Sequence, residues 1–119
     1  MNSRIVLLLL IGALGFTGCA ASTKYHWGNY ENALYNYYKK PSEINTLSEN
    51  LSKIITDGEM QGKVPPSIYA EYGYILYVTG KHEDAIIYFK KEKEAWPESQ
   101  IFMDKMINLT EIDKEKKSK

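Results

Sequence analysis

The chain has 119 residues, which is enough for one domain with a core of its own and too few for two such domains. Hydrophobic residues make up 44% of the chain and charged residues 25%, as in ordinary globular proteins. The formal net charge is zero, which argues against non-specific binding to nucleic acid, and we expect no nucleic-acid partner.

The first 19 residues have the pattern of a bacterial export signal. Arg4 supplies a positive charge, and residues 5–16 form an apolar run that is shorter than the roughly 20 residues of a membrane-spanning helix. The run closes with Phe16-Thr17-Gly18-Cys19, which resembles a lipobox, the processing signal of bacterial lipoproteins, with Phe16 where leucine is usual. An ordinary secretory signal, or a short membrane anchor with a chance cysteine, is the alternative interpretation.

The lipobox resemblance implies that residues 1–18 are a cleaved signal peptide and that Cys19, the only cysteine of the chain, carries the lipid. Residues 19–24 then form a lipidated tether. More than one acyl chain on the cysteine would make the membrane attachment stable. Ala20 resembles the residue that follows the cysteine in lipoproteins exported to the outer membrane. We therefore expect the protein on the periplasmic face of the outer membrane.

The mature domain, residues 25–113, has apolar residues at three- and four-residue spacing, and no stretch alternates with a period of two. This pattern predicts an all-α domain of about five helices. The first helix should begin at Tyr30 and end before Pro41. The second should begin at Pro41 or Ser42 and stop at Gly58.

A loop over residues 59–64 should lead to the third helix, which we expect to start at Pro65-Pro66-Ser67 and to end at Gly80. The fourth helix should run from about Glu83 to Ala95, and the fifth should begin near Glu98. The fifth helix shows the following residues as its apolar stripe: Ile101, Phe102, Met106, Leu109 and Ile112. We expect the basic tail, residues 114–119, to be a solvated, disordered end.

Residues 66–99 carry a pattern of about 34 residues in which large, small and inner apolar side chains recur in register. The matching positions are Tyr69, Tyr72, Gly73, Leu76, Gly80, Ala85, Phe89 and Pro97. The segment resembles a tetratricopeptide repeat. The resemblance implies two antiparallel helices that meet closely at Gly73 and Ala85, with aromatic rings around the contact. Glu92 departs from the pattern, because a small alanine is usual there, so we expect looser docking of residues 98–112.

A partial echo of this repeat occurs earlier, because residues 28–34 resemble residues 80–86 and Tyr37 then aligns with Phe89. The echo predicts that the first helix is the second half of a repeat whose first half is missing. The expected domain is a short tetratricopeptide-like helical solenoid, made of half a repeat, a connecting helix, one full repeat and a capping helix.

A lipobox followed by residues 25–31, Leu34 and Tyr37-Tyr38 also resembles a family of small proteobacterial lipoproteins of unknown function. This resemblance covers nearly the whole chain and implies no particular reaction. Genes of that family typically lie beside genes of other small lipoproteins, one of them similar to the curli-secretion pore lipoprotein. The resemblance therefore implies a multi-lipoprotein envelope assembly, with other envelope lipoproteins or periplasmic proteins as partners.

Aromatic residues are the candidates for an interaction surface, since the chain holds ten tyrosines. One group gathers more rings near the first helix than one side of a helix can bury: Tyr25, Trp27, Tyr30, Tyr35 and Tyr38. A second group lies within the repeat: Tyr69, Tyr72, Tyr77 and Tyr88. The alternative for the first group is that its rings only cap the open end of the solenoid.

No catalytic or metal-binding pattern can be recognised. His26 and His82 are the only histidines, and a zinc site needs three or four converging nitrogen or sulfur ligands. Five carboxylates are expected on exposed faces or at helix starts: Glu71, Glu83, Asp84, Glu92 and Glu94. We expect a non-enzymatic adaptor without cofactor or metal. Cell-wall binding or regulation of cell-wall synthesis is the alternative, and self-association through unpaired solenoid ends stays open.

Overall fold

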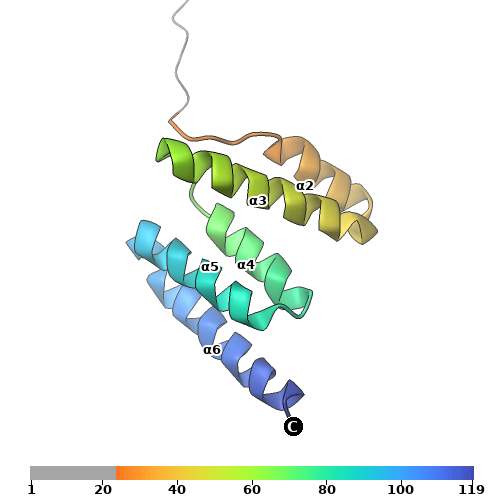
Figure 1. The fold of residues 1–119 in the computed structure, drawn as a ribbon, viewed down its shortest axis with the longest axis vertical. Helices are drawn as coiled ribbons and strands as arrows, with labels where there is room; N and C mark the ends of the chain where they lie inside the picture. The colour runs from red at the N-terminus through yellow and green to blue at the C-terminus, as the bar shows by residue number, and fades with distance from the viewer. Residues whose placement is uncertain (1–23) are drawn as a thin grey trace, which may run out of the picture.

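The computed structural model describes residues 24–119 as a set of packed α-helices (Figure 1). The predicted signal peptide, Cys19 and the tether up to residue 23 lie outside the described residues. The helices are α2 (Tyr30–Lys39), α3 (Ile44–Gln61), α4 (Ile68–Val78), α5 (His82–Ala95) and α6 (Gln100–Lys117), with the 3-10 helices η2 (Pro41–Glu43) and η3 (Pro97–Ser99) between them. Residues 24–119 contain no strand, which confirms the all-α prediction.

Each helix packs mainly against its neighbours in the chain, α2 on α3, α3 on α4, α4 on α5 and α5 on α6. Two clusters of buried side chains result. The first joins α2, α3 and α4 through residues such as Leu51, Ile54 and Ile68. The second joins α4, α5 and α6 through Leu76, Phe89 and Met103 among others. The central helix α4 therefore contributes to both halves of the core (Figure 1).

The structure gives α2 a different place from the predicted one. It pairs with α3 across the η2 turn, as the ribbon of Figure 1 shows, and it lines one groove together with α4 and α6. The structure therefore places α2 at the same groove as α4, the first helix of the predicted repeat. The echo between residues 28–34 and 80–86 reflects a shared turn, because Gly28 and Gly80 both have positive φ (50° and 84°) just ahead of a helix.

The prediction that α3 stops at Gly58 is wrong, because the helix continues to Gln61 and ends at Gly62, which has a left-handed φ of 63°. Gly58 is buried, and a Cβ there would lie 2.9 Å from Cγ2 and 3.0 Å from Cα of Val64. The chain after α3 folds back over this glycine, and the Lys63 N–H donates to the Gly58 carbonyl (N···O 2.8 Å). The close approach of the Val64 backbone therefore explains why glycine occupies position 58.

Replacing Gly58 by alanine is expected to lower the free energy of unfolding by about 1 kcal/mol. An overpacking cost of about 2 kcal/mol against Val64 exceeds the roughly 1 kcal/mol that alanine gains in helix propensity. Urea unfolding followed by circular dichroism measures the change. In a Val64→Ala background, which removes Cγ2 but keeps the Val64 backbone in place, the cost of Gly58→Ala should shrink in part, whereas the cost of Gly62→Ala, which meets only open space, should not change. A stabilising Gly58→Ala would contradict the close packing.

The contact between α4 and α5 is built around Gly73, Ala85 and Phe89. A Cβ at Gly73 would lie 2.8 Å from Cε1 of Phe89 and 3.3 Å from the Ala85 carbonyl oxygen. Ala85 and Phe89 are 0% and 1% exposed. Leu76 is buried in the same cluster, and Pro97 begins η3 directly beyond α5. The α4 helix itself begins at Ile68, so the predicted proline start lies in the turn ahead of it rather than in its first turn.

The side of α6 that faces the domain differs from the predicted stripe. Met103, Ile107 and Thr110 are buried, whereas four of the five predicted residues are exposed: Ile101, Phe102, Leu109 and Ile112. Met106 is partly buried against the core. Apolar residues occur around more than one side of α6, so their spacing alone did not identify the buried side.

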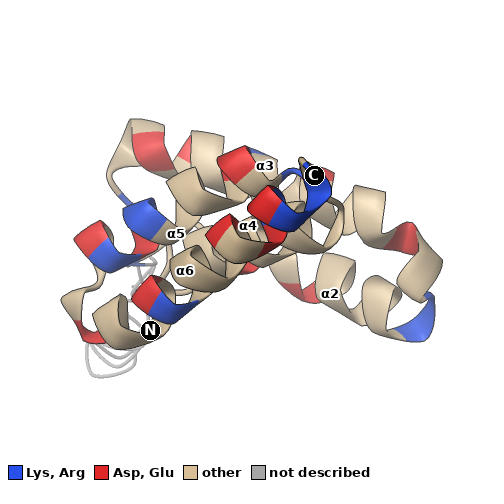
Figure 2. Ribbon diagram, turned by 90° about the horizontal axis from the view of Figure 1, so that it is seen from below, with Lys and Arg blue, Asp and Glu red and all other residues tan. Residues whose placement is uncertain are grey.

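The prediction of a disordered tail from residue 114 is wrong, because α6 continues to Lys117. Lys114 forms an ion pair with Glu83 (2.8 Å), and the Tyr77 hydroxyl donates to Asp113 (2.6 Å). The lysines at the end of α6 also interact favourably with the negative end of the helix dipole. Figure 2 shows acidic and basic residues mixed along the helices, in keeping with the zero net charge.

Candidate binding groove

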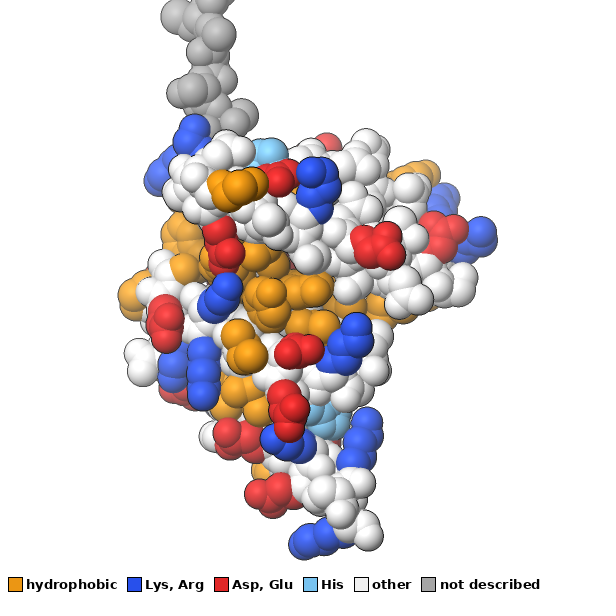
Figure 3. Space-filling view, in the orientation of Figure 1, with side chains coloured by type: hydrophobic (Ala, Val, Ile, Leu, Met, Phe, Trp, Pro, Cys, Tyr) orange, Lys and Arg blue, Asp and Glu red, His pale blue; other side chains and the backbone are white. Residues whose placement is uncertain are grey.

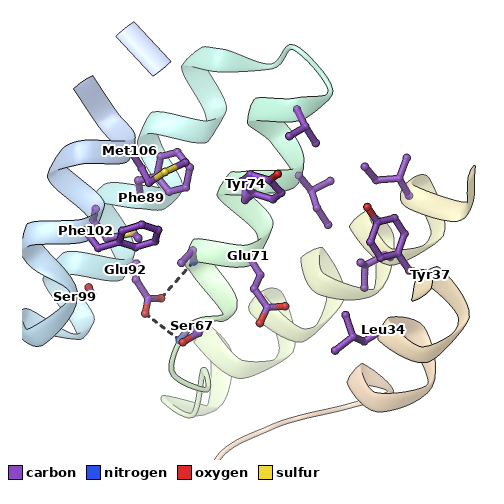
Figure 4. A pocket seen from close by; sticks show the side chains of 16 residues that line it. Leu34, Tyr37, Ser67, Glu71, Tyr74, Phe89, Glu92, Ser99, Phe102 and Met106 are labelled. Carbon is purple, nitrogen blue, oxygen red and sulfur yellow. Dashed lines mark hydrogen bonds between the residues drawn. The ribbon is translucent and has the colours of Figure 1, made fainter. Parts of the chain in front are cut away.

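A groove of about 470 Å³ lies along α4, between side chains of α2 and side chains of α6 (Figure 4). Leu34 and Tyr37 form its wall on α2, and Phe102 and Met106 form its wall on α6. Between them, α4 contributes the following residues: Ala70, Glu71, Tyr74, Ile75 and Val78. Side chains of α3 and α5, such as Leu47 and Phe89, complete the lining from the core.

Several large apolar side chains of this groove remain open to solvent. Leu34 is 39% exposed, Tyr74 52%, Val78 47% and Phe102 62%. All four line the one groove, and they come from three different helices. Large apolar side chains gathered in a groove are typical of an interaction site.

The groove contains two carboxylates. Glu92 is only 2% exposed and accepts hydrogen bonds from the backbone N–H groups of Ser67 (2.9 Å) and Ala70 (3.4 Å) (Figure 4). These donors belong to the N-terminal end of α4, so Glu92 of α5 caps a neighbouring helix. Burial raises the pKa of the Glu92 carboxyl, and the two backbone hydrogen bonds oppose that shift in part.

The second carboxylate, Glu71, lies on α4 and is partly buried. The Tyr30 hydroxyl of α2 donates to its Oε1 (2.7 Å), which ties α2 to α4. Burial raises the pKa of the Glu71 carboxyl, and the Tyr30 hydrogen bond works in the opposite direction. Among residues 24–119, no basic side chain forms an ion pair with Glu71 or Glu92. The groove is therefore apolar and acidic.

Both carboxylates were expected on exposed faces or at helix starts. Glu71 does lie in the first turn of α4, where it is partly buried. The structure corrects the expectation for Glu92, which is among the few buried charged residues of the described chain. Glu83, Asp84 and Glu94 are exposed as expected. The departure of Glu92 from the repeat pattern was the one sequence signal for its role.

None of the nine aromatic residues predicted as an interaction surface lines the groove. Tyr69, Tyr72 and Tyr88 pack together, with ring centroids 4.6 Å apart for Tyr72 and Tyr88 and 6.4 Å apart for Tyr69 and Tyr88. The Tyr69 hydroxyl donates to Glu59, which is also paired with Lys91 (2.8 Å), and Lys91 lies over the Tyr69 and Tyr88 rings. Figure 3 shows a band of hydrophobic side chains across this face of the domain, with charged groups beside it.

The remaining predicted aromatics do not form one patch. Tyr25 contacts Trp96 (centroids 5.8 Å apart), and Trp27 contacts Tyr30 (5.5 Å). Tyr77 stacks on His82 (5.6 Å) at the other end of α4. Tyr35 and Tyr38 on α2 are the most exposed of the set, at 59% and 80%.

The tyrosines that do line the groove, Tyr37 and Tyr74, were absent from the predicted surface. The sequence analysis aligned Tyr37 with a packing position, and Tyr74 matched no repeat position. Their spacing on α2 and α4 carries no signal that both face one groove, because that depends on how the two helices pack.

Residues 24–119 contain no cluster of three or more His, Cys, Asp or Glu side chains that could hold a metal ion. None of the described helices is long and apolar enough to cross a membrane. The groove thus offers apolar contact, hydroxyls and two carboxylates.

Searches among curated proteins and among solved structures gave no match. Residues 24–106 match a family described as a domain of unknown function, DUF4810. The match spans α2 to α5 and the first part of α6, and it includes every helix that lines the groove. The chain is therefore a member of the DUF4810 family.

Proposed function

We propose that the protein is a lipid-anchored, non-enzymatic adaptor that binds other envelope proteins at the periplasmic face of the outer membrane. The observation that carries the proposal is the open apolar groove, whose large side chains come from α2, α4 and α6. Binding of a partner over such a groove is favourable, because it removes apolar surface from water. The lipobox-like residues ending at Cys19 support attachment to a membrane by lipid.

We also infer that the domain is a short tetratricopeptide-like array. The close contact of Gly73 with Phe89 and Ala85 and the neighbour-to-neighbour packing of the helices support this interpretation. In that array α2 and α3 form one pair, α4 and α5 a second, and α6 stands alone at the end. The groove then corresponds to the side formed by the first helix of each pair.

Capture of partners from crosslinked envelopes tests the adaptor proposal. The full-length protein should retain specific lipoproteins or periplasmic proteins, and Cys19→Ser, which removes the acceptor of the lipid, should lose membrane attachment and capture. Phe102→Asp places a charge in the groove and should reduce capture by at least about tenfold.

Ile101→Asp is the matched control, because Ile101 is a neighbouring exposed residue of α6 that does not line the groove. It should capture the same partners as the wild type. If Ile101→Asp abolished capture and Phe102→Asp did not, the groove assignment would be refuted. Attachment of the lipidated protein without any captured partner would refute the adaptor itself.

Cell-wall binding is the second candidate, because Tyr35 and Tyr38 expose 59% and 80% of their surface on α2 and could stack on sugar rings. Co-sedimentation of the protein with purified peptidoglycan tests it. Wild type should sediment, and Tyr35→Ala with Tyr38→Ala should not. Absence of the wild type from the pellet would exclude this candidate.

A further inference from the structure

The residue types that line the groove indicate which kind of partner it can bind. Its lining contains apolar side chains, tyrosine and serine hydroxyls and the carboxylates of Glu71 and Glu92, but no Lys, Arg or His. The two carboxylates are not equivalent. Glu92 is held by two backbone donors, whereas Glu71 receives a hydrogen bond from the Tyr30 hydroxyl at Oε1.

Covering the groove would remove the remaining water from Glu71. A carboxylate that loses its water without gaining a counter-charge is either destabilised or must take up a proton, so a partner without a cation at this place would bind at a penalty. A lysine or arginine that reaches Glu71 removes the penalty and adds a charge-assisted hydrogen bond. Charge complementarity therefore selects a basic partner.

The groove also favours a particular backbone conformation. An extended peptide needs hydrogen-bond partners for its own N–H and C=O groups, and the mostly apolar lining offers few of them. A helix satisfies its backbone internally and presents only side chains. From Ala70 to Val78, the α4 face spans about 12 Å, which matches the distance over which a helix repeats one apolar face through positions i, i+4 and i+7.

We propose that the groove binds an amphipathic helix of a partner protein, with apolar residues along α4 and a lysine or arginine paired with Glu71. This inference rests on the proposed adaptor function and specifies the partner surface. The basic residue lies on the border of the apolar face of the partner helix, where it meets Glu71 while its neighbours contact Tyr74 and Phe102.

The experiment places the photocrosslinker p-benzoylphenylalanine at position 74 of the full-length protein in the envelope, and maps the crosslinked peptide by mass spectrometry. The same crosslinker at Ile87, an exposed residue of α5 outside the groove, is the control position. The peptide crosslinked from position 74 should have helical apolar spacing and a basic residue within one turn of the crosslinked residue.

Glu71→Gln keeps an oxygen for the Tyr30 hydroxyl and removes the charge, and it should lower the crosslink yield at position 74 about tenfold. Glu49→Gln, an exposed residue outside the groove, removes the same charge and should leave the yield unchanged. Glu71→Lys should abolish the crosslink, and exchange of the partner's basic residue for glutamate should restore it.

The outcomes separate the two proposals. A position-74 crosslink to a segment without a basic residue, or a yield unaffected by Glu71→Gln in a protein with wild-type thermal stability, overturns the helix inference and leaves the adaptor in place. Absence of any crosslink at position 74 in the lipidated, folded protein counts against the adaptor groove itself.

Discussion

Phe89→Ala is expected to lower the free energy of unfolding by about 3 to 5 kcal/mol, the range for removal of a fully buried aromatic side chain. Phe89 is 1% exposed and contacts Gly73 across the α4–α5 contact. Because single domains are stable by only about 5 to 15 kcal/mol, this loss should bring the domain close to unfolding. Urea unfolding monitored by circular dichroism measures the loss.

Ile87→Ala is the matched control on the same helix, since Ile87 is 51% exposed, and it should cost less than about 1 kcal/mol. Equal losses for the two variants would contradict the placement of Phe89 at the centre of the second core cluster.

A double-mutant cycle tests whether the ring of Phe89 is the reason for glycine at position 73. Gly73→Ala alone should destabilise the domain, because the added Cβ would lie 2.8 and 2.9 Å from two ring carbons. Phe89→Leu removes those ring carbons. In that background Gly73→Ala should cost less than it does in the wild type, by about 1 kcal/mol of coupling. Additive costs would mean that the Ala85 carbonyl, and not the ring, limits the space.

The close contact of α4 and α5 was expected because residues 66–99 resemble a tetratricopeptide repeat, in which a small residue on one helix lies opposite a ring on the next. The structure has such a contact between Gly73 and Phe89. The sequence did not predict the orientation of α6. Its apolar residues surround more than one side of the helix, so the buried side is decided by α5, whose surface the pattern of α6 does not encode.

The groove was predicted least well, and the reason is physical. Tyrosine suits a core, a rim or an open surface equally, so residue type did not separate Tyr69, which is buried, from Tyr74, which is half exposed in the groove. Which rings face solvent depends on the angle between helices that are distant in sequence. The acidic character of the groove likewise depends on Glu92 reaching the start of α4, 22 to 25 residues away in sequence.

Replacement of Glu92 is expected to cause the second large loss of stability. Glu92→Leu would leave the Ser67 and Ala70 N–H groups without their acceptor, and it should cost about 2 kcal/mol near neutral pH. Glu92→Gln retains one acceptor oxygen for the shorter of the two hydrogen bonds, from Ser67, and should cost less. Urea unfolding of the two variants and of the wild type gives the three free energies of unfolding to be compared. If the Glu92→Leu variant were at least as stable as the Glu92→Gln variant, the cap would contribute little to stability.

The pH dependence of the Glu92→Gln variant follows from the raised pKa of Glu92 in the folded chain. The folded state binds the proton more tightly than the unfolded chain does, so the wild type loses stability as pH rises from the ordinary carboxyl range through the raised pKa. Glutamine does not titrate. The free energy of unfolding of Glu92→Gln minus that of the wild type should therefore increase with pH over this window and level off above it. Glu94→Gln, an exposed position on the same helix, corrects for the change in net charge. A difference that decreases with rising pH would mean that the backbone donors at the start of α4 outweigh burial and hold Glu92 as the carboxylate.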